Sequence, residues 1–223
     1  MRELESFDAD IVCLQELTTH SAANPRRDIP AEIAALGYHK YYVQSLHNAE
    51  TDMGNGIFSR LPIAGSRSVY VQHEDPAVQD YSRENRIYLE TVLSMGQARL
   101  TIGTVHLSYA QEFHDTAGKE RETNRLLEAI KGNRSRFVLT GDLNSPPGSY
   151  TVSALDKLLR PAGPRYGEAT WTTKPFSYNG FEANTLSWRL DYAFTSPDIK
   201  VLDSRIMPTE ASDHLPILTT LEI

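Results

Sequence analysis

Three short polar motifs stand beside apolar, strand-like runs and contain most of the residues that could do chemistry. The motifs are Leu14-Gln15-Glu16, Gly141-Asp142-Leu143-Asn144 and Ser212-Asp213-His214. The first two follow the runs Ile11–Leu14 and Phe137–Thr140, and the third precedes Pro216–Leu218. Strand ends can present side chains to one shared cleft, and carboxylates with an amide and an imidazole suit a hard divalent cation and a general base. This combination indicates metal-assisted phosphoester hydrolysis.

The first two motifs each allow a catalytic and a structural interpretation. Glu16 closes an apolar strand and is either a metal ligand or an ordinary exposed carboxylate. Gly141 allows a tight backbone turn, after which Asp142 could orient or deprotonate a water and Asn144 could donate a hydrogen bond to a phosphoryl oxygen. The alternative for this pair is an Asp/Asn turn that leads into the segment Ser145–Gly148.

The third motif needs a partner from elsewhere in the chain. Adjacent side chains on an extended backbone point to opposite faces, so a bend is required for both Asp213 and His214 to serve one site. If Asp191 accepts from the ring N–H of His214, it fixes the tautomer and raises the basicity of the other ring nitrogen. His106, at the end of the run Leu100–Val105, is a second acid/base candidate, and a structural histidine is the alternative.

The composition describes an ordinary globular chain with an acidic balance. It has 223 residues, 40% hydrophobic and 23% charged, and a net charge of −7 from 22 basic and 29 acidic residues. Non-specific nucleic-acid binders usually rely on a basic face, so this balance counts against such a function without excluding a local basic groove. The single cysteine, Cys13, excludes an internal disulfide, and its apolar surroundings favour buried packing over reactivity.

The chain carries no sign of a second domain or of a membrane segment. It has no internal repeat and no low-complexity linker, so residues 1–223 are expected to form one domain. No apolar signal-peptide core follows Met1, and no apolar run reaches the length of a membrane span. We therefore expect a cytoplasmic monomer without membrane insertion, although an incomplete N-terminus could hide a targeting segment.

Strand-like runs recur along the chain and outnumber helices. The expected strands are Ile11–Leu14, Gly56–Ser59, Ile87–Leu93, Leu100–His106, Phe137–Thr140, Leu190–Thr195 and Pro216–Ile223, and the expected helices are Ile29–Leu36, Lys119–Lys131 and Ser153–Leu159. The two strands on either side of Gly96 are rich in β-branched residues and are expected to form a hairpin. This mixture predicts mixed sheets flanked by helices.

Long irregular segments in a compact domain are often functional. They are His73–Asn85, Ser108–Gly118 and Tyr166–Ser187. The last segment contains four aromatic residues, Trp171, Phe176, Tyr178 and Phe181. These rings could stack on a base or bury an apolar group, which makes Trp171 a candidate substrate-binding residue. Plain packing within the loop is the alternative.

Taken together, the motifs resemble the endonuclease/exonuclease/phosphatase superfamily in type and in order. The series is Leu14-Gln15-Glu16, Gly54–Arg60, Thr104–Leu107, Gly141-Asp142-Leu143-Asn144, Arg189-Leu190-Asp191-Tyr192 and Ser212-Asp213-His214. The match runs from about Asp10 to the C-terminus. It implies a deoxyribonuclease-I-like fold, an α/β (α+β) four-layer sandwich of two packed mixed β-sheets flanked by helices.

The resemblance also implies a metal and a phosphate site. Glu16 would bind the divalent metal, usually Mg²⁺ and alternatively Mn²⁺, and Asp213 would approach it. Asp142 would orient the attacking water, and Asn144 would contact the phosphoryl oxygen.

The same resemblance implies an acid/base pair and a set of substrate contacts. Asp191 would pair with His214, the general base, while His106 would hydrogen-bond the scissile phosphate or assist the leaving group. Asn55 matches a position near the phosphate. Tyr81, Arg83 and Arg86 fall where members of the superfamily place phosphate contacts, and solvated loop residues are the alternative for these three.

The sequence departs from the superfamily at its beginning. Members start with a core strand that carries an active-site asparagine, followed by a helix that leads to the strand with the metal glutamate. Here Met1–Phe7 matches the end of that helix. The resemblance therefore implies that the first core strand is missing and that the domain is incomplete at its N-terminus.

Three functions remain open on the sequence alone. A phosphodiesterase or phosphatase acting on a phosphoester of a small molecule or of single-stranded nucleic acid is the preferred interpretation. A Mg²⁺-dependent endonuclease or exonuclease acting on DNA or RNA uses the same motifs, and the net charge of −7 disfavours long-range attraction of a duplex. A catalytically lapsed relative that binds a phospholigand is the third, supported by the missing strand and opposed by the intact motifs.

Overall fold

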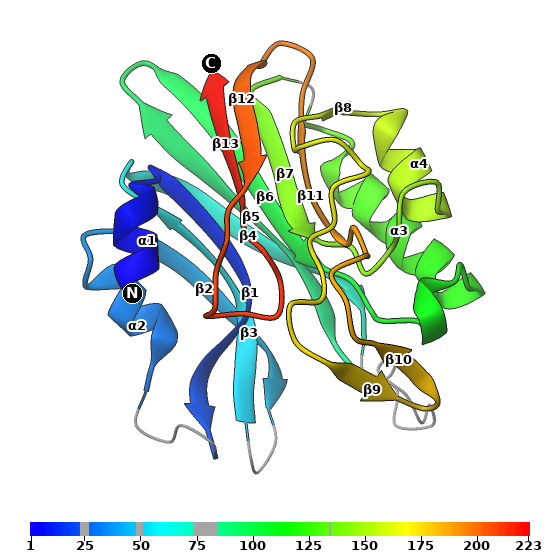
Figure 1. Cartoon of the computed structure of the whole chain (residues 1–223). Helices are drawn as coiled ribbons and strands as arrows, with labels where there is room; N and C mark the ends of the chain where they lie inside the picture. Colours follow the sequence, from blue (N-terminus) through cyan, green and yellow to red (C-terminus); the bar gives the residue numbers. More distant parts are fainter. Residues whose placement is uncertain (23–26, 48–50, 74–83, 134) are drawn as a thin grey trace.

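The computed structural model of the chain describes residues 1–22, 27–47, 51–73, 84–133 and 135–223 (Figure 1). The elements in chain order are α1 (Arg2–Phe7), β1 (Ile11–Ser21), α2 (Ile29–Ala34), β2 (His39–His47), β3 (Thr51–Ser59), β4 (Ile63–Gln72), β5 (Arg86–Met95), β6 (Ala98–His106), η2 (Gln111–Phe113), α3 (Ala117–Ile130), β7 (Phe137–Asp142), α4 (Tyr150–Asp156), β8 (Arg160–Pro161), β9 (Phe176–Tyr178), β10 (Phe181–Ala183), β11 (Asp191–Thr195), β12 (Lys200–Ile206) and β13 (Ile217–Glu222). Among these residues, no helix combines the length and apolar character needed to cross a membrane.

The larger sheet has six strands in the order β4-β5-β6-β7-β11-β8. β6 and β7 pair in parallel, and the other neighbours pair antiparallel, so the sheet is mixed. A parallel pair needs a crossover connection, and α3 lies in that connection. Because β6 and β7 run in the same direction, both end at the same edge of the sheet.

The smaller sheet has the order β1-β3-β2 and packs face to face with the larger one. Ile57 of β3 shares a buried cluster with Leu89, Ile102 and Val138 from three strands of the larger sheet. The partly buried Cys13 packs against this cluster, and burial raises the pKa of its thiol to about 11. The expected packing of this cysteine is therefore confirmed.

Helices cover the outer face of each sheet, which gives four layers (Figure 1). Leu126 of α3 and Val152 of α4 pack with Leu139 of β7. On the other side, Ile33 of α2 packs with Phe58 of β3. The four-layer sandwich of two mixed or antiparallel sheets confirms the expected fold class.

Most expected elements are present, with differences at their ends. The hairpin around Gly96 is confirmed, with Leu93 of β5 opposite Leu100 of β6. The helix expected at Ser153–Leu159 lies three residues earlier, because Ser149 caps it by accepting a hydrogen bond from the backbone N–H of Val152 at 3.3 Å. The expected loop His73–Asn85 falls largely outside the described residues, which end at His73 and resume at Glu84.

Six strands, β2, β4, β8, β9, β10 and β12, were not expected. β8, β9 and β10 have only two or three residues each, too few to show a pattern. β4 is exposed at most of its positions, and β12 exposes Val201 and Leu202. Strands that are largely exposed lack the apolar alternation on which a sequence pattern depends.

One edge of the smaller sheet is open. Within the described part of the chain, β1 pairs with β3 on one side and has no strand partner on the other, while β13 pairs with β12 alone. β2 forms the other edge of this sheet and likewise pairs with β3 alone among the described residues. Unpaired ladder groups on a sheet edge favour association with a further strand.

A chain extended at its N-terminus by one strand is expected to melt at a higher temperature and to turn over faster, because the added strand would pair the free edge of β1. Thermal unfolding followed by circular dichroism measures the difference. An extension of equal length made of Gly and Ser is the control. Equal melting temperatures for the two extended chains would contradict the expectation.

Candidate active site

The site is built on one row of residues across three neighbouring strands. His106 is the register partner of Asp142 in the parallel pair β6–β7, and Asp142 is also the partner of Asp191 in the antiparallel pair β7–β11. The row lies where β6 and β7 end and β11 begins. Backbone pairing alone therefore brings an imidazole and two carboxylates to one edge of the larger sheet.

Gly141 permits this close approach of β6 and β7. Its φ is 151°, and a Cβ at this position would lie 2.0 Å from the carbonyl oxygen of Val105, in the neighbouring strand. β7 ends at Asp142, and Asn144 lies two residues further along the chain. The φ of Asn144 is 45°, a left-handed conformation that Asn adopts more readily than most residues. The turn after β7 thus directs Asp142 and Asn144 to the same side.

His214 reaches this row from the segment ahead of β13. Its Nδ1 lies 2.8 Å from Oδ2 of Asp191, so the expected hydrogen bond between the two is confirmed. The bend required by the Asp213–His214 pair is present, because the backbone N–H of His214 donates to Oγ of Ser212 at 3.1 Å. This turn lets neighbouring residues face one site.

The electrostatic setting of His214 favours its protonated form. Burial lowers the pKa of the ring, but the carboxylates of Asp191 and Asp142 outweigh burial and raise the pKa to about 10. Nε2 of His214 lies 3.9 Å from Oδ2 of Asp142. The ring therefore has Asp191 at one nitrogen and the interior of the site at the other.

Asp142 stands between the two histidines. Its Oδ2 is 3.6 Å from Nε2 of His106, and its Oδ1 accepts the backbone N–H of Asn144 at 2.8 Å. Burial raises the pKa of this carboxyl to about 7, although the charge of His214 lowers it. Asp142, Asp191 and His214 each offer a ligand atom within 4.8 Å of the others, a spacing that could also hold a cation.

His106 is held as a neutral ring. Nη1 of Arg86 lies 3.2 Å from its Nδ1. Because a guanidinium can only donate, Nδ1 accepts and the ring proton is on Nε2, the nitrogen that faces Asp142. Burial, followed by the charge of Arg86, holds the pKa of His106 well below its usual range. His106 is therefore a hydrogen-bond donor toward the site.

Glu16 reaches the site because β1 is irregular at this point. A register shift falls between Leu14 and Leu17, and Glu16 has a φ of 55°. Its side chain is 63% exposed, and its Oε1 lies 3.9 Å from Nε2 of His106. Next to it, Nε2 of Gln15 donates to Oγ1 of Thr104 at 2.8 Å and ties β1 to β6.

Three residues expected to contact substrate are buried instead, which corrects the sequence interpretation. Asn55 is 3% exposed, and its amide donates to the carbonyl of Ile87 at 3.3 Å. Arg86 is 6% exposed and bonds Glu84 at 2.9 Å as well as His106. The amide of Asn55 and both terminal nitrogens of Arg86 bond other groups of the protein, while the buried Nε of Arg86 has no hydrogen-bond partner among the described residues. Tyr81 and Arg83 lie outside the described residues.

The third correction concerns Trp171, which is 4% exposed and has almost no free face for a stacked base. Its ring packs against Phe113 and Phe176 with centroid distances of 5.3 and 5.1 Å. Its Nε1–H donates to Oδ2 of Asp213 at 3.0 Å. Loop packing, the alternative interpretation, describes this residue better, and its contact with the site is through Asp213.

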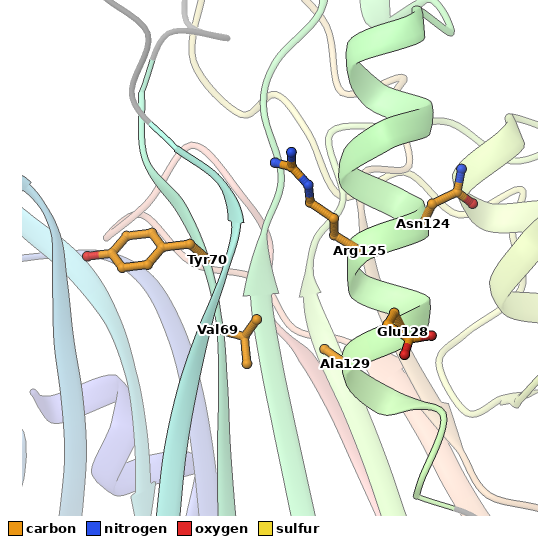
Figure 2. A pocket seen from close by; sticks show the side chains of 6 residues that line it. All are labelled: Val69, Tyr70, Asn124, Arg125, Glu128 and Ala129. Carbon is orange, nitrogen blue, oxygen red and sulfur yellow. The ribbon is translucent and has the colours of Figure 1, made fainter.

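A separate hollow lies away from this row. A groove of about 390 Å³ runs between β4 and α3 (Figure 2) and is lined by Val69, Tyr70, Asn124, Arg125, Glu128 and Ala129. None of these six belongs to the carboxylate and imidazole row, and the guanidinium of Arg125 already donates to the carbonyl of Val71 at 3.2 Å. The chemistry-bearing residues therefore gather at the strand ends.

A mixed sheet packed on an antiparallel sheet, with carboxylates and imidazoles at the strand ends, defines a deoxyribonuclease-I-like fold. The chain belongs to the Endonuclease/Exonuclease/phosphatase family, whose sequence profile matches residues 1–214. Endonucleases, exonucleases and phosphatases, which give the family its name, all cleave phosphoester bonds. Comparison with curated proteins gave no significant sequence match.

Solved structures of low sequence identity share the fold. An endonuclease/exonuclease/phosphatase from Beutenbergia cavernae is 22% identical with a TM-score of 0.74, over 99% of this chain and 64% of that one. The mannosyl-6-phosphatase Bt3783 of Bacteroides thetaiotaomicron is 19% identical with a TM-score of 0.66, over 100% and 88%. The 2′,3′-cyclic phosphatase ANGEL2, bound to adenosine-2′,3′-vanadate, is 18% identical with a TM-score of 0.68, over 99% and 84%. This chain thus spans less than two thirds of the Beutenbergia protein.

Proposed function

We propose that the chain is a metal-dependent phosphoester hydrolase in which water attacks phosphorus in a single in-line displacement, with no covalent enzyme intermediate. The observation that carries this proposal is the hydrogen bond of 2.8 Å between His214 and Asp191, with Asp142 on the inner side of the ring. A histidine oriented by one carboxylate and facing a second is a suitable general base for water.

In this mechanism Asp191 is the positioning residue and His214 takes the proton from the attacking water. Asp191 holds Nδ1–H, so the water proton goes to Nε2 of His214. Asp142 lies within 3.9 Å of this nitrogen and orients the water as a hydrogen-bond acceptor. Nε2 of His214 can take this proton only while it carries none. Because the pKa of His214 is about 10, the mechanism requires that binding of the substrate and the cation lowers this pKa.

Neutral donors stabilise the phosphoryl group. With its ring proton on Nε2, His106 donates a hydrogen bond to a phosphoryl oxygen and does not act as an imidazolium acid. Asn144 is 8% exposed, and its Nδ2 donates to the carbonyl of Leu107 at 2.9 Å. This Nδ2 lies 3.2 Å from Nε2 of His106; because both atoms carry hydrogen, the contact is not a hydrogen bond, and an oxygen acceptor beside them would satisfy both. Hydrogen-bond donors that are already in position before the reaction stabilise the negative charge that develops on phosphoryl oxygens.

The donor set fits a hard divalent cation. Glu16 has an open carboxylate, with Arg86 and His214 as positive neighbours and Asp213 and Glu84 as negative ones. Carboxylate oxygens suit Mg²⁺ or Mn²⁺, so Glu16 and Asp213 would hold the ion. When bound, the ion supplies positive charge that stabilises the phosphoryl oxygens.

The proposed substrate is a phosphomonoester or phosphodiester on a small molecule or a single strand. The named structural relatives include a mannosyl-6-phosphatase and a 2′,3′-cyclic phosphatase, which supports this size of substrate. The net charge of −7 opposes attraction of duplex nucleic acid.

A substrate panel tests the proposal. The purified chain with Mg²⁺ or Mn²⁺ is assayed on a sugar phosphate, a 2′,3′-cyclic nucleotide, a single-stranded oligonucleotide and duplex plasmid, with the His214→Ala protein as the background. We expect hydrolysis of one or more of the first three, above that background. Salt-sensitive nicking of plasmid alone would instead support the duplex nuclease, and binding without hydrolysis would support the lapsed relative.

A further inference from the structure

The first turns of α3 bury two charged residues directly beneath the site. Lys119 is 3% exposed and Glu122 is 1% exposed. We propose that Lys119 and Glu122 are positioning residues that fix the loops after β6 and β7, and with them His106 and Asn144, relative to each other. The inference rests on the proposed function, and neither residue touches the reacting atoms.

Lys119 joins the loops that follow β6 and β7. Its Nζ donates to the carbonyl of Ser108 at 2.9 Å and to the carbonyl of Leu143 at 2.6 Å. Ser108 is two residues past His106, and Leu143 is the residue between Asp142 and Asn144. One ammonium therefore sets the separation of the two backbone segments that end in the catalytic row.

Glu122 holds the same loop from the next turn of the helix. One of its oxygens accepts the backbone N–H of Ser108 at 3.0 Å, and the other accepts the hydroxyl of Ser108. Ser108 is itself 2% exposed. The N–H, hydroxyl and carbonyl of Ser108 are thus all bonded to side chains of α3. These bonds hold the backbone of the loop in the observed conformation.

The helix is a firm support for these contacts. Thr116 caps it by accepting the backbone N–H of Lys119 at 3.2 Å. The hydroxyl of Thr123 donates to the carbonyl of Lys119 at 2.8 Å and lies 2.8 Å from the hydroxyl of Thr151, which is on α4. A movement of Lys119 would therefore require a movement of two packed helices.

The cost of burial indicates a role other than stability. Burial lowers the pKa of Lys119 to about 8, although the charges of Glu122 and Asp142 act to raise it. Buried opposite charges are commonly no more stabilising than apolar residues of the same volume, but each charge here bonds loop groups in a fixed geometry. Apolar residues here could fill the space between α3 and the sheet, but they could not bond the loop carbonyls.

Two variants that keep the side-chain volume test the inference, Lys119→Met and Glu122→Gln. The controls are Lys131→Met and Glu128→Gln, which remove the same charges from exposed positions at the end of the same helix. Each protein is measured for kcat and KM, for thermal unfolding, and for the nuclear magnetic resonance signals of the His106 ring. All rates are taken at a temperature where every variant is fully folded.

For Lys119→Met we expect kcat to fall about 100-fold, the order of loss that a small misplacement of catalytic groups causes, with KM changed less than about threefold. The His106 ring signals should shift in both variants and in neither control. The double variant should lose less than the product of the two single losses, because both residues act through Ser108. If Lys119→Met fails to fold, Ser108→Ala, which keeps the carbonyl, should shift the same ring signals and lower kcat about tenfold.

Folded variants with the kcat of the parent chain would overturn the inference and leave a purely structural role. So would unchanged His106 signals. If the parent chain hydrolyses no phosphoester, the proposed function fails, and the His106 signals still decide whether Lys119 and Glu122 set the loop geometry.

Discussion

Replacing His214 by alanine is expected to lower turnover by about 10²–10⁴-fold, the contribution that a positioned general base makes. The loss follows from geometry, since Nδ1 of His214 is bonded to Asp191 at 2.8 Å and its other nitrogen faces Asp142. The protein should stay folded, with a melting temperature lower by up to about 10 °C, because His214 then no longer compensates the charges of Asp191 and Asp142. The side chain of His214 is 28% exposed.

Asp191→Asn tests the same pair from its other side. The carboxylate of Asp191 raises the pKa of His214 more than any other charge does. A base works only after it has lost its proton, so the rate rises with pH as His214 deprotonates. Removing the Asp191 charge should therefore move this rise to lower pH while kcat falls, because the ring is no longer held in one orientation.

His39→Ala is the control for the histidine variant, because this exposed residue lies on β2 and carries no part of the site. It should leave the rate unchanged. A His214→Ala protein that keeps more than about a third of the parent rate would remove His214 from the mechanism.

The pairing of His214 with Asp191 was implied by the resemblance to the superfamily, and the structure contains this hydrogen bond. The apolar runs themselves predict strands whose ends carry polar residues. Strands of one sheet bring such ends together, and the row His106, Asp142 and Asp191 is the direct result. The hairpin around Gly96 could be predicted for a similar reason, since its signal is local. The hairpin depends on residues close together in the chain, and the row depends on the pairing of predicted strands, so both could be predicted.

The buried polar network could not be predicted. Lys119 and Glu122 lie in a run of charged residues, Lys119-Glu120-Arg121-Glu122, that has the composition of a solvated helix face. The partners of Lys119, Ser108 and Leu143, are 11 and 24 residues away along the chain, and Ser108 is 14 residues from Glu122. Helical spacing places both charges on the buried face with Leu126 and Ile130, but it does not identify the loop groups that they bond.

Trp171 shows a related limit. An aromatic residue in a long polar loop suggests a binding surface, but here Trp171 packs with Phe176 and Phe181 of the β9–β10 hairpin in one cluster that also contains Phe113. The apolar surface of the loop is buried within the protein, so the ring of Trp171 is not free to contact substrate. Its polar N–H is what reaches the site, and it does so by bonding Asp213.

Removing divalent metal with EDTA is expected to stop hydrolysis, and adding back Mg²⁺ or Mn²⁺ should restore it. Glu16 provides the test residue, because its carboxylate is open and no described side chain lies within hydrogen-bond distance of it. Glu16→Gln keeps the shape of the side chain and removes its charge. Removing a group that hydrogen-bonds a metal ligand commonly lowers the affinity for the metal about 10-fold or more. Removing the charge of the ligand Glu16 itself should therefore raise the metal concentration for half-maximal rate by at least about tenfold.

Binding of Mn²⁺ followed by electron paramagnetic resonance separates the metal from the chemistry. Glu16→Gln should weaken Mn²⁺ binding, whereas His214→Ala should leave it nearly unchanged, because the proposed ligands are Glu16 and Asp213. The exposed Glu5 of α1 supplies the control, and Glu5→Gln should bind as the parent chain does. Full activity in EDTA would exclude the metal-dependent mechanism, and a Glu16→Gln protein with the parent affinity would move the ion to the cluster of Asp142, Asp191 and His214. In that case His214 could not serve as the base, since its free nitrogen would be occupied, and the two variants therefore test the metal site and the acid/base assignment together.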